Sequence, residues 1–285
     1  MSLKPLERKA LQHHPLPRVA DGDKDSKGRI LVIAGSREVP GAAVLTATAA
    51  MRAGAGKLKI ATVASVAVQV GIAMPEAMVV GLAEDDNGGF APDSLAFLRE
   101  DANKVDAVIA GPGMAQNDTC DDIAAALLAS NARVALDAAL LRALQTTGKA
   151  CASTPVLLPH AGELASLLDC SEEEIERDPI ECGLRAADRF RAIVLVKGVK
   201  SHVVTPGGRA WHYEGGAPGL GVSGSGDVLA GIVGGLLARG AEPLNALLWA
   251  VWLHGEAGAA LAKKVGPIGF LARQISDEIP ALLPR

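Results

Sequence analysis

The sequence predicts an α/β fold in which helices cover both faces of a largely parallel sheet. Short apolar runs rich in β-branched residues alternate with longer Ala- and Leu-rich segments, which is the pattern of repeated βαβ units. The short runs are apolar throughout, as expected of strands buried on both faces. Hydrophobic residues make up 49% of the 285 residues and aromatic residues only 3%, so we expect a large aliphatic core.

The first βαβ unit is the clearest. Residues 29–34 form a strand, residues 41–54 form an Ala-rich helix closed by Gly54, and residues 57–63 form the next strand. A hairpin is expected near Gly207-Gly208. Further strands are expected at 105–110, 133–137, 156–159, 193–197 and 201–205. Further helices are expected at 121–129, directly after residue 160, and at 179–191. Two long apolar helices, at 227–238 and 244–263, are expected to end the chain.

The domain organisation follows from the same pattern. Residues 1–27 are polar and Pro-rich, and we expect them to form an N-terminal arm. Residues 28–285 are expected to form a single catalytic domain, because α/β folds often reach roughly 250 residues as one unit.

Composition excludes several classes of protein. The net charge is −4 and no Lys/Arg cluster is present, which argues against a nucleic-acid partner. No apolar run approaches the roughly 18 residues of a membrane span, and no secretory signal is recognisable. None of the cysteines has zinc-ligand spacing, so we expect reduced thiols and a cytoplasmic location; they are Cys120, Cys151, Cys170 and Cys182.

Gly and polar residues follow several of the predicted strands. In open α/β sheets, ligands bind beyond the carboxyl ends of the strands, so these residues are expected to meet at one edge. They are Gly35-Ser36, Gly111-Pro112-Gly113, Asp137, His160 with Glu163, and Lys197-Gly198.

The segment 215–231, GGAPGLGVSGSGDVLAG, carries the strongest functional signal. Gly224-Ser225-Gly226 directly precedes an apolar helix, whose free N–H groups and dipole stabilise a phosphate. Asp227 would then lie beside a transferred phosphoryl group as a general base. From the local pattern alone, Asp227 as a helix N-cap beside a flexible loop is an equal alternative. No Walker A motif is present.

Other candidates are weaker on their own. The turn Lys197-Gly198-Val199-Lys200-Ser201 would hold nucleotide phosphates, or be a solvated turn between strands. His160 would orient a substrate, or be a hydrogen-bonded structural residue. His254 lies within an apolar helix and is expected only to pack there.

Several of these segments together resemble the family of ADP-dependent NAD(P)H-hydrate dehydratases, in the ribokinase-like superfamily. The resemblance extends from about Gly28 to about Leu261. Its motifs are Gly41-Ala42-Ala43 with AMRAGAGK at 50–57, Gly111-Pro112-Gly113, LDAALL at 136–141, LLPHAGE at 157–163, KGVKS at 197–201 and PGLGVSGSGDVLAGIVGGLLARG at 218–240.

This resemblance implies a ribokinase-like three-layer α/β/α sandwich and a repair activity. Such enzymes remove water from hydrated NADH and NADPH at the expense of ADP, giving AMP and phosphate, with Mg²⁺ as cofactor. The mechanism implied is phosphorylation of the ring hydroxyl followed by loss of phosphate. The resemblance also implies a homo-oligomer, expected to be a tetramer.

The site residues that the resemblance implies fall into four groups. Asp227 acts as base and contacts the hydrate, and Gly224, Ser225 and Gly226 form the anion hole, with Gly226 also touching the adenine nucleotide. The nucleotide side is lined by Lys197, Gly198, Val199, Lys200 and Ser201. The hydrated dinucleotide is contacted by Ala42, Ala43, Gly113 and His160, and Glu163 helps to place Mg²⁺ through water.

The sequence departs from the family pattern in two places. The LDA segment has Ala139 where relatives often have a second Asp, although Asp137 remains. Many relatives carry an N-terminal epimerase domain, and the short arm predicts action on one epimer only.

Two other functions fit the same motifs. One is an ATP-dependent kinase of the same superfamily acting on a thiamine-precursor or sugar alcohol, which would accumulate a phosphorylated product. The other is a nucleotide-binding sensor without turnover, against which Asp227 argues because a non-catalytic site has no need of a base. ADP and ATP are not distinguished by any local feature.

Overall fold

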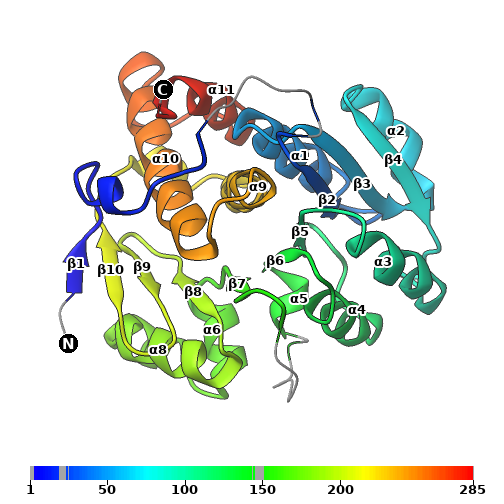
Figure 1. Ribbon diagram of the computed structural model, residues 1–285, viewed down its shortest axis with the longest axis horizontal. Coiled ribbons are helices and arrows are strands. Elements are labelled where there is room, and N and C mark those ends of the chain that lie inside the picture. The colour runs from blue at the N-terminus through cyan, green and yellow to red at the C-terminus, as the bar shows by residue number, and fades with distance from the viewer. Residues whose placement is uncertain (1–2, 19–23, 25, 143, 145–150, 285) are drawn as a thin grey trace.

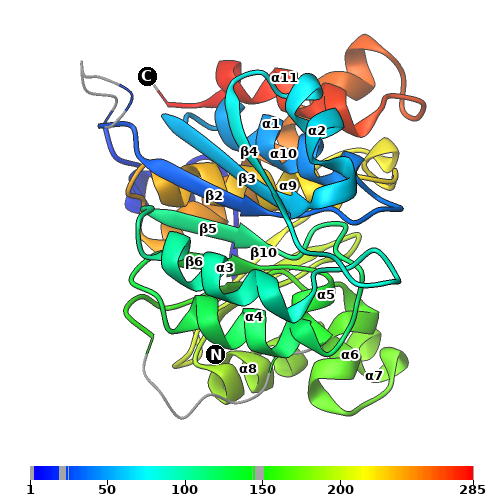
Figure 2. The same ribbon diagram turned by 90° about the vertical axis from the view of Figure 1, so that its right-hand side faces the viewer.

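A ten-stranded sheet between two layers of helices forms the centre of the molecule (Figures 1 and 2). The computed structural model describes residues 3–18, 24, 26–142, 144 and 151–284. The strand order is β1-β10-β9-β8-β7-β6-β5-β2-β3-β4. Within the described residues, all neighbouring strands are parallel except the antiparallel pairs β8–β9 and β9–β10. The predicted α/β architecture with a mostly parallel sheet is confirmed.

The strands are short, and most are apolar throughout. They are β1 (Leu3–Pro5), β2 (Arg29–Ile33), β3 (Lys57–Val63), β4 (Ala77–Leu82), β5 (Ala107–Ala110), β6 (Arg133–Leu136), β7 (Val156–Leu157), β8 (Ile193–Val196), β9 (Ser201–Val204) and β10 (Ala210–Tyr213). Parallel pairing puts the ends of β2, β5, β6, β7 and β8 at one edge, where the predicted Gly and polar residues follow them.

Helices α1, α9, α10 and α11 cover one face of the sheet, and α3, α4, α5, α6 and α8 cover the other (Figure 1). No helix of the described ranges is both long and apolar enough to cross a membrane. The helices are α1 (Gly41–Arg52), α2 (Ala67–Ala73), α3 (Leu95–Ala102), α4 (Thr119–Leu128), α5 (Ala139–Arg142), α6 (Ala161–Leu168), α7 (Glu172–Arg177), α8 (Pro179–Phe190), α9 (Ser225–Ala238), α10 (Pro243–Lys264) and α11 (Ala272–Leu282), with 3₁₀ turns at Ala10–His13, Ala64–Val66, Pro92–Ser94 and Pro218–Leu220.

Some elements differ from the prediction. The sheet edge β4, with α2 and α3 around it, lies in a stretch where no element was expected, although its sequence AMVVGL is apolar throughout. The expectation that two long apolar helices end the chain was wrong, since α11 follows them. That helix buries only one side, so its apolar residues are interspersed with polar ones.

Part of the segment expected as an N-terminal arm lies against the rest of the fold. Leu3–Pro5 pairs in parallel with β10, and Leu6 and Leu11 are buried in the core. The indole Nε1 of Trp249 on α10 donates to the carbonyl oxygen of His14 at 2.7 Å. The expected arm also includes residues 19–23 and 25, which lie outside the described residues.

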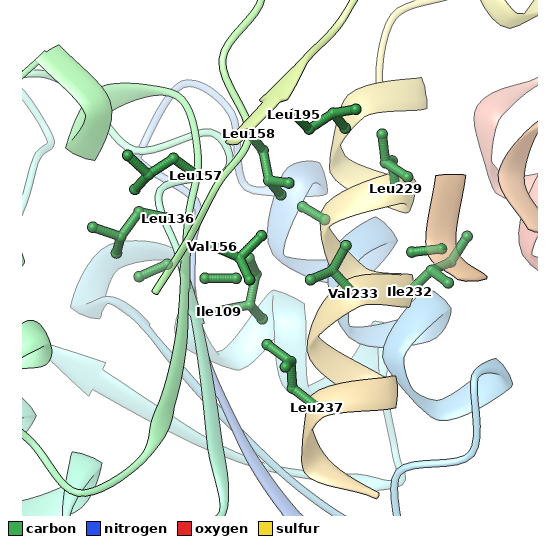
Figure 3. Packing of buried hydrophobic residues seen from close by; sticks show 14 of the residues in the cluster. Ile109, Leu136, Val156, Leu157, Leu158, Leu195, Leu229, Ile232, Val233 and Leu237 are labelled. Carbon is green, nitrogen blue, oxygen red and sulfur yellow. The ribbon is translucent and has the colours of Figure 1, made fainter. Parts of the chain in front are cut away.

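Helix α9 is buried along nearly its whole length between α1 and the sheet. Val233 and Leu237 lie on the side facing the sheet residues in Figure 3. On the α1 side, glycines replace larger residues: a Cβ at Gly231 would lie 2.2 Å from the Thr46 carbonyl oxygen, and one at Gly235 would lie 2.3 Å from that of Ala50. The two helix backbones are therefore in direct contact, and this contact fixes the position of the start of α9.

We predict that Gly231→Ala lowers the free energy of unfolding by about 2 kcal/mol, because the added methyl group forces α1 and α9 apart. Gly71→Ala on α2 is the control, since its Cβ would meet Val79 at an ordinary 3.7 Å. That control should be neutral or stabilising by about 0.5 kcal/mol, because Ala favours the helix. Urea denaturation measures both, and equal effects of the two substitutions would refute close packing at Gly231.

Candidate active site

The start of α9 presents free backbone donors toward a cavity. Gly224 is the N-cap with φ of +88°, a conformation that glycine adopts without strain. The Ser225 N–H donates to Val222 O, and the Val228 N–H donates to Gly224 O. For the N–H groups of Gly226 and Asp227 the described part of the chain supplies no acceptor. Two free N–H groups at a helix N-terminus are suited to bind an anion, and these two are called the anion hole below.

Asp227 lies half-buried beside this anion hole. Its Oδ2 is 3.9 Å from a Cβ built at Gly224, and its backbone carbonyl accepts from Thr46 Oγ1 at 3.1 Å. Burial, with a smaller contribution from the Asp137 carboxylate, raises the pKa of Asp227 to about 6, against the opposing effect of Lys197. A carboxylate with this pKa is ionised at neutral pH and is a stronger base than an ordinary aspartate.

Lys197 is the cation of the site. Its Nζ lies 2.7 Å from Asp137 Oδ1 and 3.9 Å from Glu163 Oε2. A Cβ at Gly226 would lie 3.9 Å from the same Nζ, so the ammonium group faces the anion hole. The described structure therefore brings Asp137, which follows β6, into the site through Lys197, which follows β8.

A cavity of about 700 Å³ opens in front of the anion hole. Its volume is in the range of pockets for nucleotide-sized ligands. Of the residues predicted for the nucleotide side, Lys197, Gly198, Val199 and Ser201 line it, together with Ser225 and Gly226. Lys200 instead forms an ion pair with Glu214 at 3.0 Å, with 60% of its side chain exposed.

Three of the residues predicted to contact the dinucleotide lie at or beside the start of α1. Ala42 and Ala43 lie at the start of α1 and are buried. Gly113, with φ of +62°, packs so closely that a Cβ there would lie 2.4 Å from the Ala42 Cβ. The structure therefore places Gly113 against the start of α1, beside Ala42 and Val39.

His160 and Glu163 are joined in a capping box at the start of α6. The His160 Nδ1 accepts from the N–H groups of Gly162 and Glu163, and Glu163 Oε2 accepts from the His160 N–H at 2.9 Å. The His160 ring remains 55% exposed while the Glu163 carboxylate is buried. The structure shows the hydrogen-bonded structural role considered for His160, and its Nε2 lies 3.4 Å from Glu163 Oε1.

His254 is the residue that the sequence analysis placed least well. It was expected only to pack within an apolar helix, but it lines the cavity and its Nε2 lies 3.0 Å from Ser225 Oγ. Tyr213 was not expected in the site either, and its hydroxyl donates to Glu256 at 3.0 Å in the cavity wall. The signal for His254 was weak, because it was one of several polar side chains, with Asn245 and Glu256, in the predicted helix 244–263.

Comparisons with known proteins agree with this geometry. The family model described as NAD(P)H-hydrate dehydratase matches residues 30–281. The chain is 45% identical to the ADP-dependent (S)-NAD(P)H-hydrate dehydratase of Xanthomonas campestris pv. campestris, over 97% of this chain and 94% of that protein. The chain belongs to the NAD(P)H-hydrate dehydratase family.

Solved structures support both the family and the fold. The ADP/ATP-dependent NAD(P)H-hydrate dehydratase of Bacillus subtilis, co-crystallised with ATP and Mg²⁺, matches with a TM-score of 0.85 and 27% identity over 99% of this chain and 98% of that one. A ribokinase-like superfamily protein of Enterococcus faecalis matches with a TM-score of 0.82 and 25% identity over 98% and 95%. The fold is ribokinase-like. The chain spans about half the length of several other curated relatives, which are bifunctional NAD(P)H-hydrate repair enzymes.

We predict that Asp227→Asn stabilises the protein at neutral pH. The folded pKa of about 6 lies above the ordinary 3.8, so the wild type loses stability as pH rises from about 4 to about 6 and does not regain it above. The variant lacks this loss and should be more stable at pH 7 by on the order of 1 kcal/mol, with the gain disappearing near pH 4.

Urea denaturation at the two pH values measures this difference. Asp277→Asn is the control, since Asp277 forms an exposed ion pair with Arg52 and should give no such gain. A gain for Asp227→Asn that is equal at pH 4 and pH 7 would contradict the assignment of the burial effect to this carboxylate.

Proposed function

We propose that the chain is an ADP-dependent NAD(P)H-hydrate dehydratase that converts the (6S) hydrates of NADH and NADPH to the reduced cofactors, with AMP and phosphate as the other products. The observation that carries this proposal is the position of Asp227 beside the free N–H groups of α9, with Lys197 opposite and a large cavity in front. Membership of the family supports the choice of substrate.

In the first step the ring hydroxyl of the hydrate attacks the terminal phosphoryl group of ADP. Asp227 accepts the hydroxyl proton, a new O–P bond forms, and the bond from phosphorus to AMP breaks. The N–H groups of Gly226 and Asp227 stabilise the charge on the transferred group, and Lys197 Nζ adds a positive charge from the other side.

In the second step the phosphorylated ring loses phosphate. The C–O bond breaks, phosphate leaves with the electron pair, and the proton on the neighbouring ring carbon passes to water, which restores the double bond. Hydroxide is a poor leaving group and phosphate is a good one, so the first step makes the second one possible. The anion hole that received the phosphoryl group then also stabilises the departing phosphate.

The other predicted residues have binding roles in this proposal. Lys197 to Ser201 hold the nucleotide, with Lys200 reaching it only from the cavity rim. Ala42, Ala43 and Gly113 offer backbone groups to the hydrated dinucleotide, because the two alanine side chains are buried and Gly113 has none. His160 contacts the same ligand through its side chain, which is 55% exposed.

We propose Mg²⁺ as the cofactor. Mg²⁺ prefers oxygen ligands and binds through one or two carboxylates together with substrate phosphates and waters. Asp137 and Glu163 supply two buried carboxylates around Lys197, which fits this chemistry. In the described ranges no three His, Cys, Asp or Glu side chains form a metal site, so phosphate oxygens would be the main ligands and Glu163 would act through water. When bound, Mg²⁺ neutralises phosphate charge.

We also propose that the enzyme is a cytoplasmic homotetramer. The four cysteines are all unpaired, which is typical of a reducing compartment. Val68 and Ile72 on α2 are 71% and 78% exposed, and such apolar side chains at a surface are typical of a subunit contact. Sedimentation of the purified protein measures the subunit number.

The decisive assay mixes the protein with chemically hydrated NADH, Mg²⁺ and either ADP or ATP, and follows absorbance of the reduced nicotinamide. We predict a nucleotide-dependent rise that is lost in Asp227→Asn, whose affinity for ADP should stay within a few-fold of the wild type. A flat trace with normal ADP binding would reject the proposal, and a phosphorylated product that accumulates would favour the kinase alternative.

The pH dependence gives a separate prediction. Because Asp227 must be ionised to accept a proton and its pKa is about 6, kcat/KM should fall as pH drops below about 6, roughly ten-fold per pH unit. Steady-state rates measured from pH 5 to 8 would show this fall in kcat/KM. A profile that stays flat across that range would exclude Asp227 as the base.

A further inference from the structure

The side chain of His254 on α10 is joined to the first residue of α9. Its Nε2 lies 3.0 Å from Ser225 Oγ and 3.1 Å from the backbone carbonyl oxygen of the same residue. Both residues line the cavity in front of the anion hole. His254 therefore contacts Ser225, the residue that precedes Gly226 and Asp227, although His254 itself lies on α10.

These two contacts determine which ring nitrogen carries hydrogen. A carbonyl oxygen only accepts hydrogen bonds, so the Nε2 that lies 3.1 Å from it must be the donor. Burial, with a further contribution from the Lys197 charge, lowers the pKa of His254 to about 4 in spite of the bond to Ser225, so the ring is neutral at pH 7. A neutral imidazole has a single N–H, and here it is at Nε2.

The position of that hydrogen controls the Ser225 hydroxyl. Because Nε2–H points at Ser225, the Oγ atom receives a hydrogen bond from the ring and cannot donate one back to it. The described part of the chain gives Oγ no other hydrogen-bond partner. The hydroxyl hydrogen is therefore free to point into the cavity that Ser225 and Gly226 both line.

We propose that His254 is a positioning residue that turns the Ser225 hydroxyl into a third donor of the anion hole, beside the N–H groups of Gly226 and Asp227. The inference rests on the proposed function, because its ligand is the phosphoryl group transferred from ADP. His254 itself touches no reacting atom. Its effect on the reaction passes entirely through the orientation of one hydroxyl hydrogen.

A double-mutant cycle tests this dependence. Ser225→Ala and His254→Leu should each lower kcat by about ten-fold with little change in KM, as expected for a lost hydrogen bond to a charged group in the transition state. The double variant should be no more than about two-fold slower than either single variant, because the two substitutions remove the same contact. His254→Gln, which keeps an N–H near the position of Nε2, should recover most of the rate.

Matched controls separate this role from general packing. Ser276→Ala removes a buried hydroxyl on α11, and His202→Gln replaces a buried histidine of β9 whose Nδ1 has no described partner. Both should leave kcat within about two-fold of the wild type. Multiplicative losses in the cycle, near one hundred-fold for the double variant, or no rescue by Gln, would overturn the proposal.

A second measurement needs no substitution that affects folding. The ¹⁵N shifts of the His254 ring, assigned with His254→Gln, should show a neutral imidazole protonated at Nε2 at pH 7. A ring protonated at Nδ1 alone would overturn the proposal even if His254→Leu fails to fold. If the wild type binds ADP but does not dehydrate the hydrate, the proposed function fails. The double-mutant cycle is then repeated with the dissociation constant of ADP as the measured quantity, and non-additive effects would still show that His254 acts through Ser225.

Discussion

The direct contact between the backbones of α1 and α9 is the constraint on which the candidate active site depends. Gly231 and Gly235 remove the side chains that would separate the two helices, and the opposite side of α9 packs on the sheet (Figure 3). A helix held on both sides cannot shift at its start, so the free N–H groups of Gly226 and Asp227 have fixed positions. Donors fixed in advance stabilise developing charge without the cost of reorganising during the reaction.

The charged side chains near the start of α9 are mostly negative. Asp137, Glu163 and Asp227 bring three carboxylates near one ammonium group, that of Lys197. Asp137 takes the close ion pair and Glu163 caps α6, so Asp227 is the carboxylate left without a close cation. Burial then raises its pKa, and the same shortage of positive charge that makes Asp227 a good base also favours binding of the cation that accompanies a nucleotide.

The sequence predicted best what depends on neighbouring residues and worst what depends on distant ones. Apolar runs located β2 and β3 to within a residue, and the glycines before Asp227 indicated the anion hole, because strand burial and helix capping are local. The pairing of Lys197 with Asp137 joins residues 60 positions apart. It follows only from the order of β6, β7 and β8 in the sheet, which periodicity does not give. His254 was missed for the same reason, since its partner depends on how α10 crosses α9.

The arrangement also explains why a kinase fold suits the removal of water. Both proposed steps change charge at one phosphoryl group: the first brings it to the acceptor oxygen, and the second carries it away with that oxygen. Donors directed at the phosphoryl oxygens therefore serve both steps without moving, and no separate acid is needed to make hydroxide leave. A dehydratase can thus arise from a kinase site when the bound substrate has a ring hydroxyl that is lost easily once it is phosphorylated. On this view the difference between the two activities lies in the substrate held beside Ala42 and Gly113, while the start of α9 and Asp227 stay the same.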